Sequence, residues 1–380
     1  MPPASGALPR RRSRRRAPAL LVAATAALGL VALAPAAMSS PLGSQRAADP
    51  ATPSVDGAGV TAKGASSKAS CSLGAKLVPT CGVLWGAAPA AFDYSSRVKS
   101  TARFESLIGR NLDIYHGYKS NNQLFPSAEE KSIAQGASGS PRLLLINYRP
   151  GMDMTWAAMA SGKGDARLDR LAKHIKSTYP GKFFIAIWHE PEHFVNQKAG
   201  SGMTAVDYRN MVRHVILRLK AQGVSNAVFV QIFQGYPAYA AQSWWKDLYP
   251  GDDVIDWIGT DSYNSGKSSG YNAGNFHDLV NRTKGSWTGW YKWATSQHPG
   301  KPLMIGEWGV FANKSDPTRQ AWFYDQMRAQ LASYPAIKAA SYFNANKLDK
   351  GTTRIDANAS SLAGYKRLTS SLPRIDLSNR

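Results

Sequence analysis

Cysteine, glutamate and long apolar runs are scarce in this sequence, and each scarcity narrows what the chain can be. Its 380 residues include only two cysteines, Cys71 and Cys81. No further cysteine and no histidine stands near them at the spacing of a zinc site. A disulfide that closes a short loop is therefore the favoured interpretation, because it suits an exported protein; two free or metal-binding thiols are the alternative.

Only one stretch is apolar enough to cross a membrane, and it runs from Ala17 to Ala37 near the N-terminus. Six arginines precede it between residues 10 and 16, and small residues at 34–36 offer a cleavage site. This layout predicts a secretory signal peptide over residues 1–37 that is removed, so that no stable membrane insertion follows. A retained anchor is the alternative, and the arginine cluster leaves both Sec and twin-arginine export open.

Residues 38–70 contain almost no large apolar side chain and are rich in Ala, Ser, Gly, Pro and Thr. Such a segment cannot bury enough surface to offset its ordering entropy, so we expect a flexible linker. Acidic residues are also few, and the formal net charge is +21. Because the lysines and arginines are scattered, no nucleic-acid interface is predicted; the charge serves solubility or weak adhesion to an anionic cell wall.

Short apolar runs bounded by turns recur eight times along residues 71–380. The eight runs are Gly82–Ala87, Leu112–His116, Arg142–Asn147, Lys182–Trp188, Ala227–Phe233, Val254–Asp261, Pro302–Glu307 and Ile337–Phe343. Most are continuous rather than alternating, which is typical of parallel strands covered on both faces. Eight strand-plus-helix units predict one domain with the α/β class of fold, a (β/α)8 TIM barrel.

Helical periodicity fills several gaps between these runs, and capping residues mark some of the helix ends. The expected helices are Ala166–His174, the segment after Thr204 with Asp207 in its cap, Leu279–Thr295, and the segment after Asp316-Pro317 with Trp322, Phe323, Met327 and Leu331 inward. The segment Asn121–Gly139 carries little helical signal and is predicted to be a loop.

Glutamate is rare in this sequence. The chain has six glutamates, and three of them lie at the ends of two predicted strands. Glu190 and Glu192 follow the fourth apolar run, and Glu307 ends the seventh. A carboxylate directly after a buried run costs desolvation free energy, which indicates function, and the carboxyl ends of barrel strands build the site. Two such acids can cleave a glycosidic bond, one protonated and the other ionised. The alternative is a pair of surface or salt-bridged residues.

Glutamates that close strands four and seven, with His189 before the first of them, resemble glycoside hydrolase family 26. This family contains retaining (β/α)8 enzymes that are mainly endo-β-1,4-mannanases, and the resemblance covers roughly residues 82–345. The run Asp256–Asn264 is also similar to the sixth strand of that family. The resemblance implies that Glu190 is the acid/base and Glu307 the nucleophile. It further implies that Tyr263 hydrogen-bonds the nucleophile and that His189 orients it or contacts sugar.

Aromatic residues at strand ends are candidate platforms for sugar rings, with packing in the core as the alternative for each. These candidates are Trp85, Trp188, Trp308 and Tyr236, and Phe233 and Asp261 are candidate cleft residues. The predicted protein is a secreted monomer that hydrolyses a β-linked polysaccharide of the mannan type. Association with the cell wall is left open. No cofactor and no metal is implied.

The segment His189–His193 also fits the H-E-x-x-H pattern of zinc proteases, which binds zinc only on a helix. Here the pattern follows a β-type run, and Pro191 would remove a backbone donor from the helix. A zinc protease is therefore the remote alternative. The nearer alternative is a barrel that binds carbohydrate or cell wall without catalysis.

Overall fold

The structure is a computed structural model that describes residues 71–380 except 90–95, 137–138, 347 and 349. The signal peptide predicted over residues 1–37 and the linker predicted over 38–70 lie outside the described residues. Within the described part of the chain, none of the helices has the length and apolar character needed to cross a membrane.

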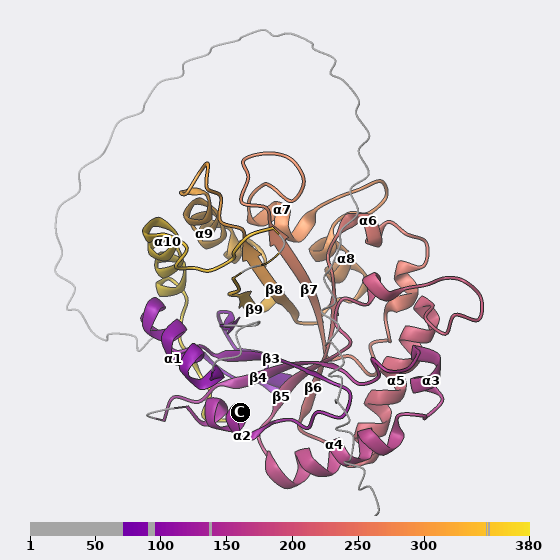
Figure 1. The fold of residues 1–380 in the computed structure, drawn as a ribbon. Helices are drawn as coiled ribbons and strands as arrows, with labels where there is room; N and C mark the ends of the chain where they lie inside the picture. Colours follow the sequence, from indigo (N-terminus) through magenta and orange to yellow (C-terminus); the bar gives the residue numbers. More distant parts are fainter. Residues whose placement is uncertain (1–70, 90–95, 137–138, 347, 349) are drawn as a thin grey trace, which may run out of the picture. The chain divides into compact units, whose positions relative to one another are not determined.

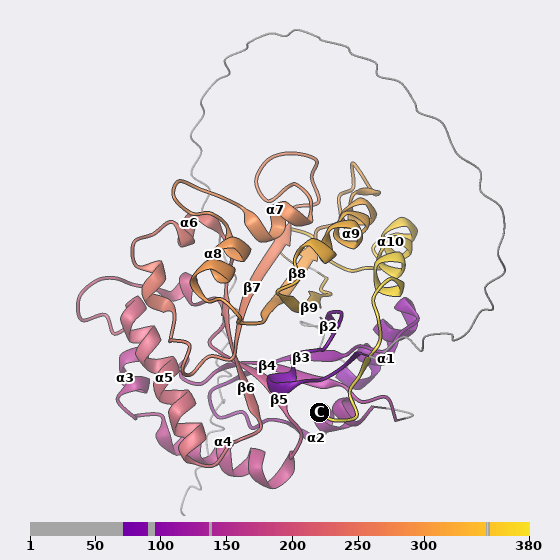
Figure 2. The same cartoon turned by 180° about the vertical axis from the view of Figure 1, so that it is seen from behind.

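Eight parallel strands close into a barrel, and each strand pairs with the next one along the sequence. The strands are β2 (Leu84–Ala88), β3 (Ile114–Ser120), β4 (Leu143–Arg149), β5 (Phe183–Ile187), β6 (Ala227–Phe233), β7 (Trp257–Asn264), β8 (Leu303–Val310) and β9 (Ile337–Phe343). The helices lie around the outside of this barrel (Figure 1), as the reverse view confirms (Figure 2). Every predicted strand overlaps one of these, so the predicted (β/α)8 fold is confirmed.

The helices of the outer layer follow the strands in sequence order. They are α1 (Arg97–Ile108), α2 (Ala128–Gln135), α3 (Trp156–Ala160), α4 (Asp165–Thr178), α5 (Ala205–Ala221), α6 (Pro237–Ala240), α7 (Phe276–Asn281), α8 (Trp290–Gln297), α9 (Arg319–Gln330) and α10 (Ala359–Ser370). The predicted cap of α5 is confirmed, because the side chains of Thr204 and Asp207 each bond the other's backbone amide.

Three helix predictions are wrong. The predicted loop Asn121–Gly139 contains α2, whose start is fixed by a capping box between Ser127 and Glu130. The single helix predicted over Leu279–Thr295 is split into α7 and α8, because Gly289 takes φ +99° and a β-carbon there would lie 2.6 Å from a backbone atom. Trp322 was expected inward but is 36% exposed, since Arg319 holds it on the outer face of α9.

Two described segments, residues 71–81 and residues 375–377, close the amino-terminal end of the barrel. The predicted disulfide Cys71–Cys81 is present, and β1 (Cys71–Ser72) pairs in parallel with β10 (Ile375–Asp376). Leu77 and the side chains of this small sheet pack against the first residues of the barrel strands. With this end filled by apolar side chains, the opposite rim is the open one.

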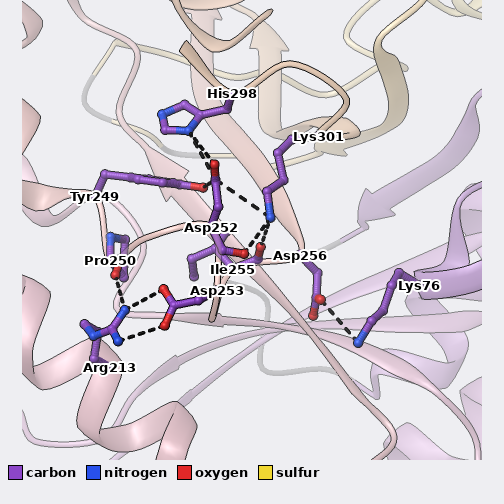
Figure 3. A network of polar contacts seen from close by, with 10 residues as sticks. All are labelled: Lys76, Arg213, Tyr249, Pro250, Asp252, Asp253, Ile255, Asp256, His298 and Lys301. Atoms are coloured by element: carbon purple, nitrogen blue, oxygen red, sulfur yellow. Dashed lines mark hydrogen bonds and ion pairs between the residues drawn. The ribbon is translucent and has the colours of Figure 1, made fainter.

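The turn that leads into β7 is held at this amino-terminal end by charged side chains (Figure 3). Asp253 makes a salt bridge of 2.7 Å with Arg213 of α5, and Asp256 makes one of 3.3 Å with Lys76. The ammonium of Lys301 donates to the carbonyl of Ile255 at 2.5 Å. These contacts anchor the start of β7 and so help to set the height at which its far end reaches the open rim.

Removal of the Glu105 carboxylate is expected to destabilise the barrel. Arg142, just before β4, is buried against Glu105 of α1, with Nη2 to Oε2 at 2.5 Å and Nε to Oε1 at 2.6 Å. In Glu105→Ala the guanidinium stays buried without its partner, which should lower the free energy of unfolding by about 3–5 kcal/mol. Urea denaturation measures this. Asp253→Ala is the control, since the pair it breaks is exposed and contributes at most about 1 kcal/mol; equal losses would contradict the prediction.

Candidate active site

Glu307 lies in β8 and is the centre of a buried polar cluster at the open rim. Its Oε2 accepts a hydrogen bond of 2.6 Å from the hydroxyl of Tyr263 in β7, and its Oε1 accepts one of 2.8 Å from Tyr118 in β3. The amide of Asn147 in β4 lies 3.5 Å from Oε1. Burial raises the pKa of Glu307, and the two tyrosine hydroxyls oppose that rise because they stabilise the ionised form.

Glu190 stands just past the end of β5 in an unusual backbone conformation. Its φ of 51° and ψ of 53° are left-handed, and Pro191 begins a short 3-10 helix directly after it. The Glu190 amide donates to the carbonyl of Ile232 in β6 at 3.1 Å, which fixes the turn against the neighbouring strand. A left-handed conformation costs a non-glycine residue about 1 kcal/mol or more, and such strain is concentrated at functional sites.

The two carboxyl groups have opposite surroundings. Burial raises the pKa of Glu190 to about 8, and the negative charge of Glu307 adds to this rise while Arg149 opposes it. Within the described residues no side chain hydrogen-bonds the Glu190 carboxyl, whereas Glu307 accepts two tyrosine hydroxyls. The raised pKa of Glu190 favours its protonated form at neutral pH, and Glu307 is the acid provided with donors for its ionised form.

His189 and Asp261 complete the cluster around Glu307. The Nε2 of His189 lies 3.8 Å from Glu307 Oε1 and 3.5 Å from a guanidinium nitrogen of Arg149. Burial, and then the charge of Arg149, hold the pKa of His189 well below its usual value, so the ring is neutral. Asp261 is fully buried beside Glu307 in the paired strands, and burial followed by the Glu307 charge raises the pKa of Asp261.

His189, Asp261 and Glu307 are also the residues that could hold a cation. Their ligand atoms lie within 4.8 Å of one another. The oxygens of Glu307 already accept two tyrosine hydroxyls, and the guanidinium of Arg149 adjoins Nε2 of His189. A divalent cation would have to displace these donors, so the donor set fits a hydrogen-bonded carboxylate better than a metal centre.

Four polar residues of this cluster escaped the sequence prediction: His116, Tyr118, Asn147 and Arg149. His116 Nδ1 lies 3.2 Å from Ser341 Oγ, and burial lowers the pKa of His116 to about 3, so it is uncharged. The first two come from β3 and the other two from β4. The sequence could have indicated these residues in the same way as the glutamates, because they are polar residues at the ends of apolar runs or directly after them.

Four of the aromatic candidates are buried in the layer between barrel and helices, which corrects the expectation that they contact sugar. Trp85 and Trp308 are both 0% exposed and pack edge to face, 5.6 Å apart. Phe233 is 0% exposed and lies against Trp245, and Trp188 is 3% exposed between two further rings. Because none of the four presents an open face, we do not assign them to substrate.

The H-E-x-x-H segment is not a helix that could bind zinc through both histidines. It spans the turn after β5 and the 3-10 helix Pro191–Phe194, so His189 and His193 contact different groups. His193 lies against Gln234 and the hydroxyl of Tyr239. Glu192 is buried and accepts a hydrogen bond of 3.0 Å from the indole of Trp245, which helps to fix this turn. The structure therefore contradicts the zinc-protease alternative.

Solved structures of glycoside hydrolases have a similar fold. A ruminal family 26 endo-β-1,4-mannanase is 13% identical, with a TM-score of 0.52 over 76% of this chain and 63% of that one. A modular endo-β-1,4-mannanase from Cellulomonas fimi is 18% identical, with a TM-score of 0.51 over 76% of this chain and 70% of that one. The chain has the fold of the glycoside hydrolase family 26 mannanases.

Sequence comparison adds a relative that matches part of this chain. No family model matches the chain. Endoglucanase H of Acetivibrio thermocellus is 26% identical over 281 residues, which are 71% of this chain and 28% of that protein. The chain thus spans less than a third of the length of this relative. The structural comparisons thus show the fold of the family 26 mannanases, and the sequence comparison adds a relative that is named as an endoglucanase.

Proposed function

We propose that the chain is a secreted endo-β-glycanase that hydrolyses a β-linked polysaccharide with net retention of configuration, with mannan as the first candidate substrate. The observation that supports this proposal is the pair of acids at the open rim: the pKa of Glu190 is raised to about 8, whereas Glu307 accepts hydrogen bonds from two tyrosine hydroxyls. The names of the relatives, mannanases and an endoglucanase, agree with a β-glycan substrate. A barrel that only bound carbohydrate would gain nothing from a protonated buried acid.

In the first step, the Glu307 carboxylate attacks the anomeric carbon while Glu190 donates its proton to the leaving oxygen. A covalent glycosyl ester on Glu307 results, and its formation removes the negative charge of that group. Because that charge contributes to the raised pKa of Glu190, the ester lowers the pKa of Glu190 again. Glu190 is then the base that deprotonates water, which attacks the ester and releases the sugar.

Tyr118 and Tyr263 are positioning residues for the nucleophile, one on each carboxylate oxygen. Removing either hydroxyl, in Tyr118→Phe or Tyr263→Phe, should lower kcat/KM about 10- to 100-fold, since a hydrogen bond to a charged group contributes about 1.5–3 kcal/mol. Each change should also raise the Glu307 pKa, and because catalysis needs the ionised form, the acidic limb of the pH–rate profile should move to higher pH. A loss of rate with an unmoved acidic limb would contradict the assignment.

The function is tested with purified protein on a panel of mannan, mixed-linkage β-glucan and xylan. Wild type should release oligosaccharides from at least one of these polymers, and Glu190→Ala should not. The configuration of the first product, followed by proton NMR, distinguishes the mechanisms: the β-anomer appears first if the enzyme retains. An α-anomer as first product would refute double displacement, and no release from any polymer would refute the proposed activity.

A further inference from the structure

Tyr271 is an aromatic side chain that is exposed to solvent. It is 67% exposed, which is the largest exposed fraction among the described large apolar side chains that face solvent. It lies in the segment between β7 and α7, beyond the carboxyl end of a barrel strand. Exposing a large aromatic ring forfeits its burial free energy, so a ring exposed at the rim of an active site is a candidate for ligand contact.

A second tyrosine lies beside it. The ring centroids of Tyr236 and Tyr271 are 6.1 Å apart, with 30° between the ring planes. Tyr236 lies between β6 and α6, three residues after the strand ends, and Pro237 follows it. The two rings therefore come from the loops of neighbouring strands and form one aromatic surface, which we call the tyrosine platform.

The tyrosine platform adjoins the strand to which the turn of the acid is bonded. The turn of Glu190 is bonded to β6, the strand that leads to Tyr236. Burial and then the charge of Glu190 raise the pKa of Tyr236. The tyrosines that hydrogen-bond Glu307 are different ones, from β3 and β7.

The segment that carries Tyr271 is fixed at both ends. The Ser265 amide donates to the Asn272 carbonyl at 2.7 Å, and the Asn264 side chain donates to the Gly274 carbonyl at 2.9 Å. Arg282 donates to the Tyr263 carbonyl at 2.9 Å, and its charge acts on both platform tyrosines. The position of Tyr271 is therefore set relative to β7 and to the site.

We infer that Tyr236 and Tyr271 bind the pyranose ring of the leaving part of the polysaccharide, next to the bond that is cleaved; this rests on the proposed function. The acid donates its proton to the leaving oxygen, so the sugar attached to that oxygen lies on the acid's side of the cleft. The C–H face of a β-linked pyranose is apolar and stacks on aromatic rings. Tyr271 offers that face, and the ring of Tyr236 lies beside it.

The test compares two substrates that differ only in the leaving group. For β-1,4-manno-oligosaccharides, and for mixed-linkage β-glucan oligosaccharides in parallel, Tyr271→Ala should lower kcat/KM about 10-fold, and Tyr271→Trp should retain it. For the corresponding β-glycosyl fluoride, whose leaving group has no ring to stack, Tyr271→Ala should equal wild type. The matched control is Trp322→Ala, which removes an exposed aromatic ring from the outer face of α9. Equal losses on both substrates, or no loss on either, would overturn the platform.

A binding measurement separates this inference from the proposed function. Calorimetry with the same oligosaccharides should show a roughly 10-fold weaker affinity for Glu307→Ala/Tyr271→Ala than for Glu307→Ala alone. If wild type hydrolyses nothing but the affinity still depends on Tyr271, the platform stands and the proposed activity fails. If wild type hydrolyses the oligosaccharides and the two affinities are equal, or Glu307→Ala binds neither oligosaccharide, the platform fails.

Discussion

Glu307→Gln is expected to lower kcat on the polysaccharide at least about 10⁴-fold, because an amide cannot attack the anomeric carbon to form the ester. The fold should not suffer. Burial raises the pKa of Glu307, which means that the folded chain disfavours its charge relative to water, and a neutral amide of the same shape avoids that cost. The variant should therefore unfold at the same temperature as wild type or higher, in a differential scanning calorimeter.

The control for this experiment is a glutamate outside the cluster. Glu129 Oε1 accepts from the Arg97 amide at the start of α1, at 2.6 Å, and glutamine can accept that bond as well. Glu129→Gln should keep the activity of wild type. If Glu307→Gln retained more than about a hundredth of the wild-type rate, some other group would have to be the nucleophile, and Asp261 would be the first to examine.

The barrel could be predicted from the sequence because its strands are buried on both faces. Leu143 to Ile146 in β4 are 0% exposed without alternation, and such continuous runs stand out between turns. Helix α2 was missed because its eight residues form little more than two turns, too few for a periodic pattern. Its capping residues, Ser127 and Glu130, were the better signal.

The acids of the site were predictable for a related reason, since a charged residue that ends an apolar run is costly unless it has a use. The prediction that the strand-end aromatic residues contact sugar was wrong because it did not take the geometry of a strand into account. Successive side chains of a strand point to opposite faces, so if Glu307 faces the barrel mouth, Trp308 must face the helices. Tyr118 follows the same rule, since it lies two residues after His116 on the same face of β3.

The partners of Glu307 depend on how the strands align, which no local pattern contains. Tyr118 is 189 positions from Glu307, and the two meet because β3 and β8 belong to one closed barrel. The pairing of Asp261 with Glu307 follows an irregularity in the register between β7 and β8. A shift of one residue in this register would turn Tyr263 away from the nucleophile.

Glu190→Gln is expected to lower kcat on the polysaccharide about 10²- to 10⁴-fold, because a sugar alkoxide leaves slowly without a proton. In wild type, activity should be lost as the pH rises through about 8, where Glu190 loses the proton that it must donate. Since glutamine does not titrate, that alkaline limb of the kcat/KM profile should be absent in the variant. An alkaline limb that persists unchanged in Glu190→Gln would assign the acid to another residue.

Removal of the Glu190 carboxyl should matter least where the leaving group needs no proton. With a dinitrophenyl glycoside, formation of the ester should proceed in Glu190→Ala at a rate close to that of wild type, and the ester should accumulate because no base activates water. Azide needs no base and should speed turnover, giving a β-glycosyl azide through the intact Glu307. In Glu307→Ala azide can only attack the substrate itself, so the azide product must have the opposite configuration. The two anomers therefore assign the two acids independently of any loss of rate, and one shared anomer would mean that the roles have been misassigned.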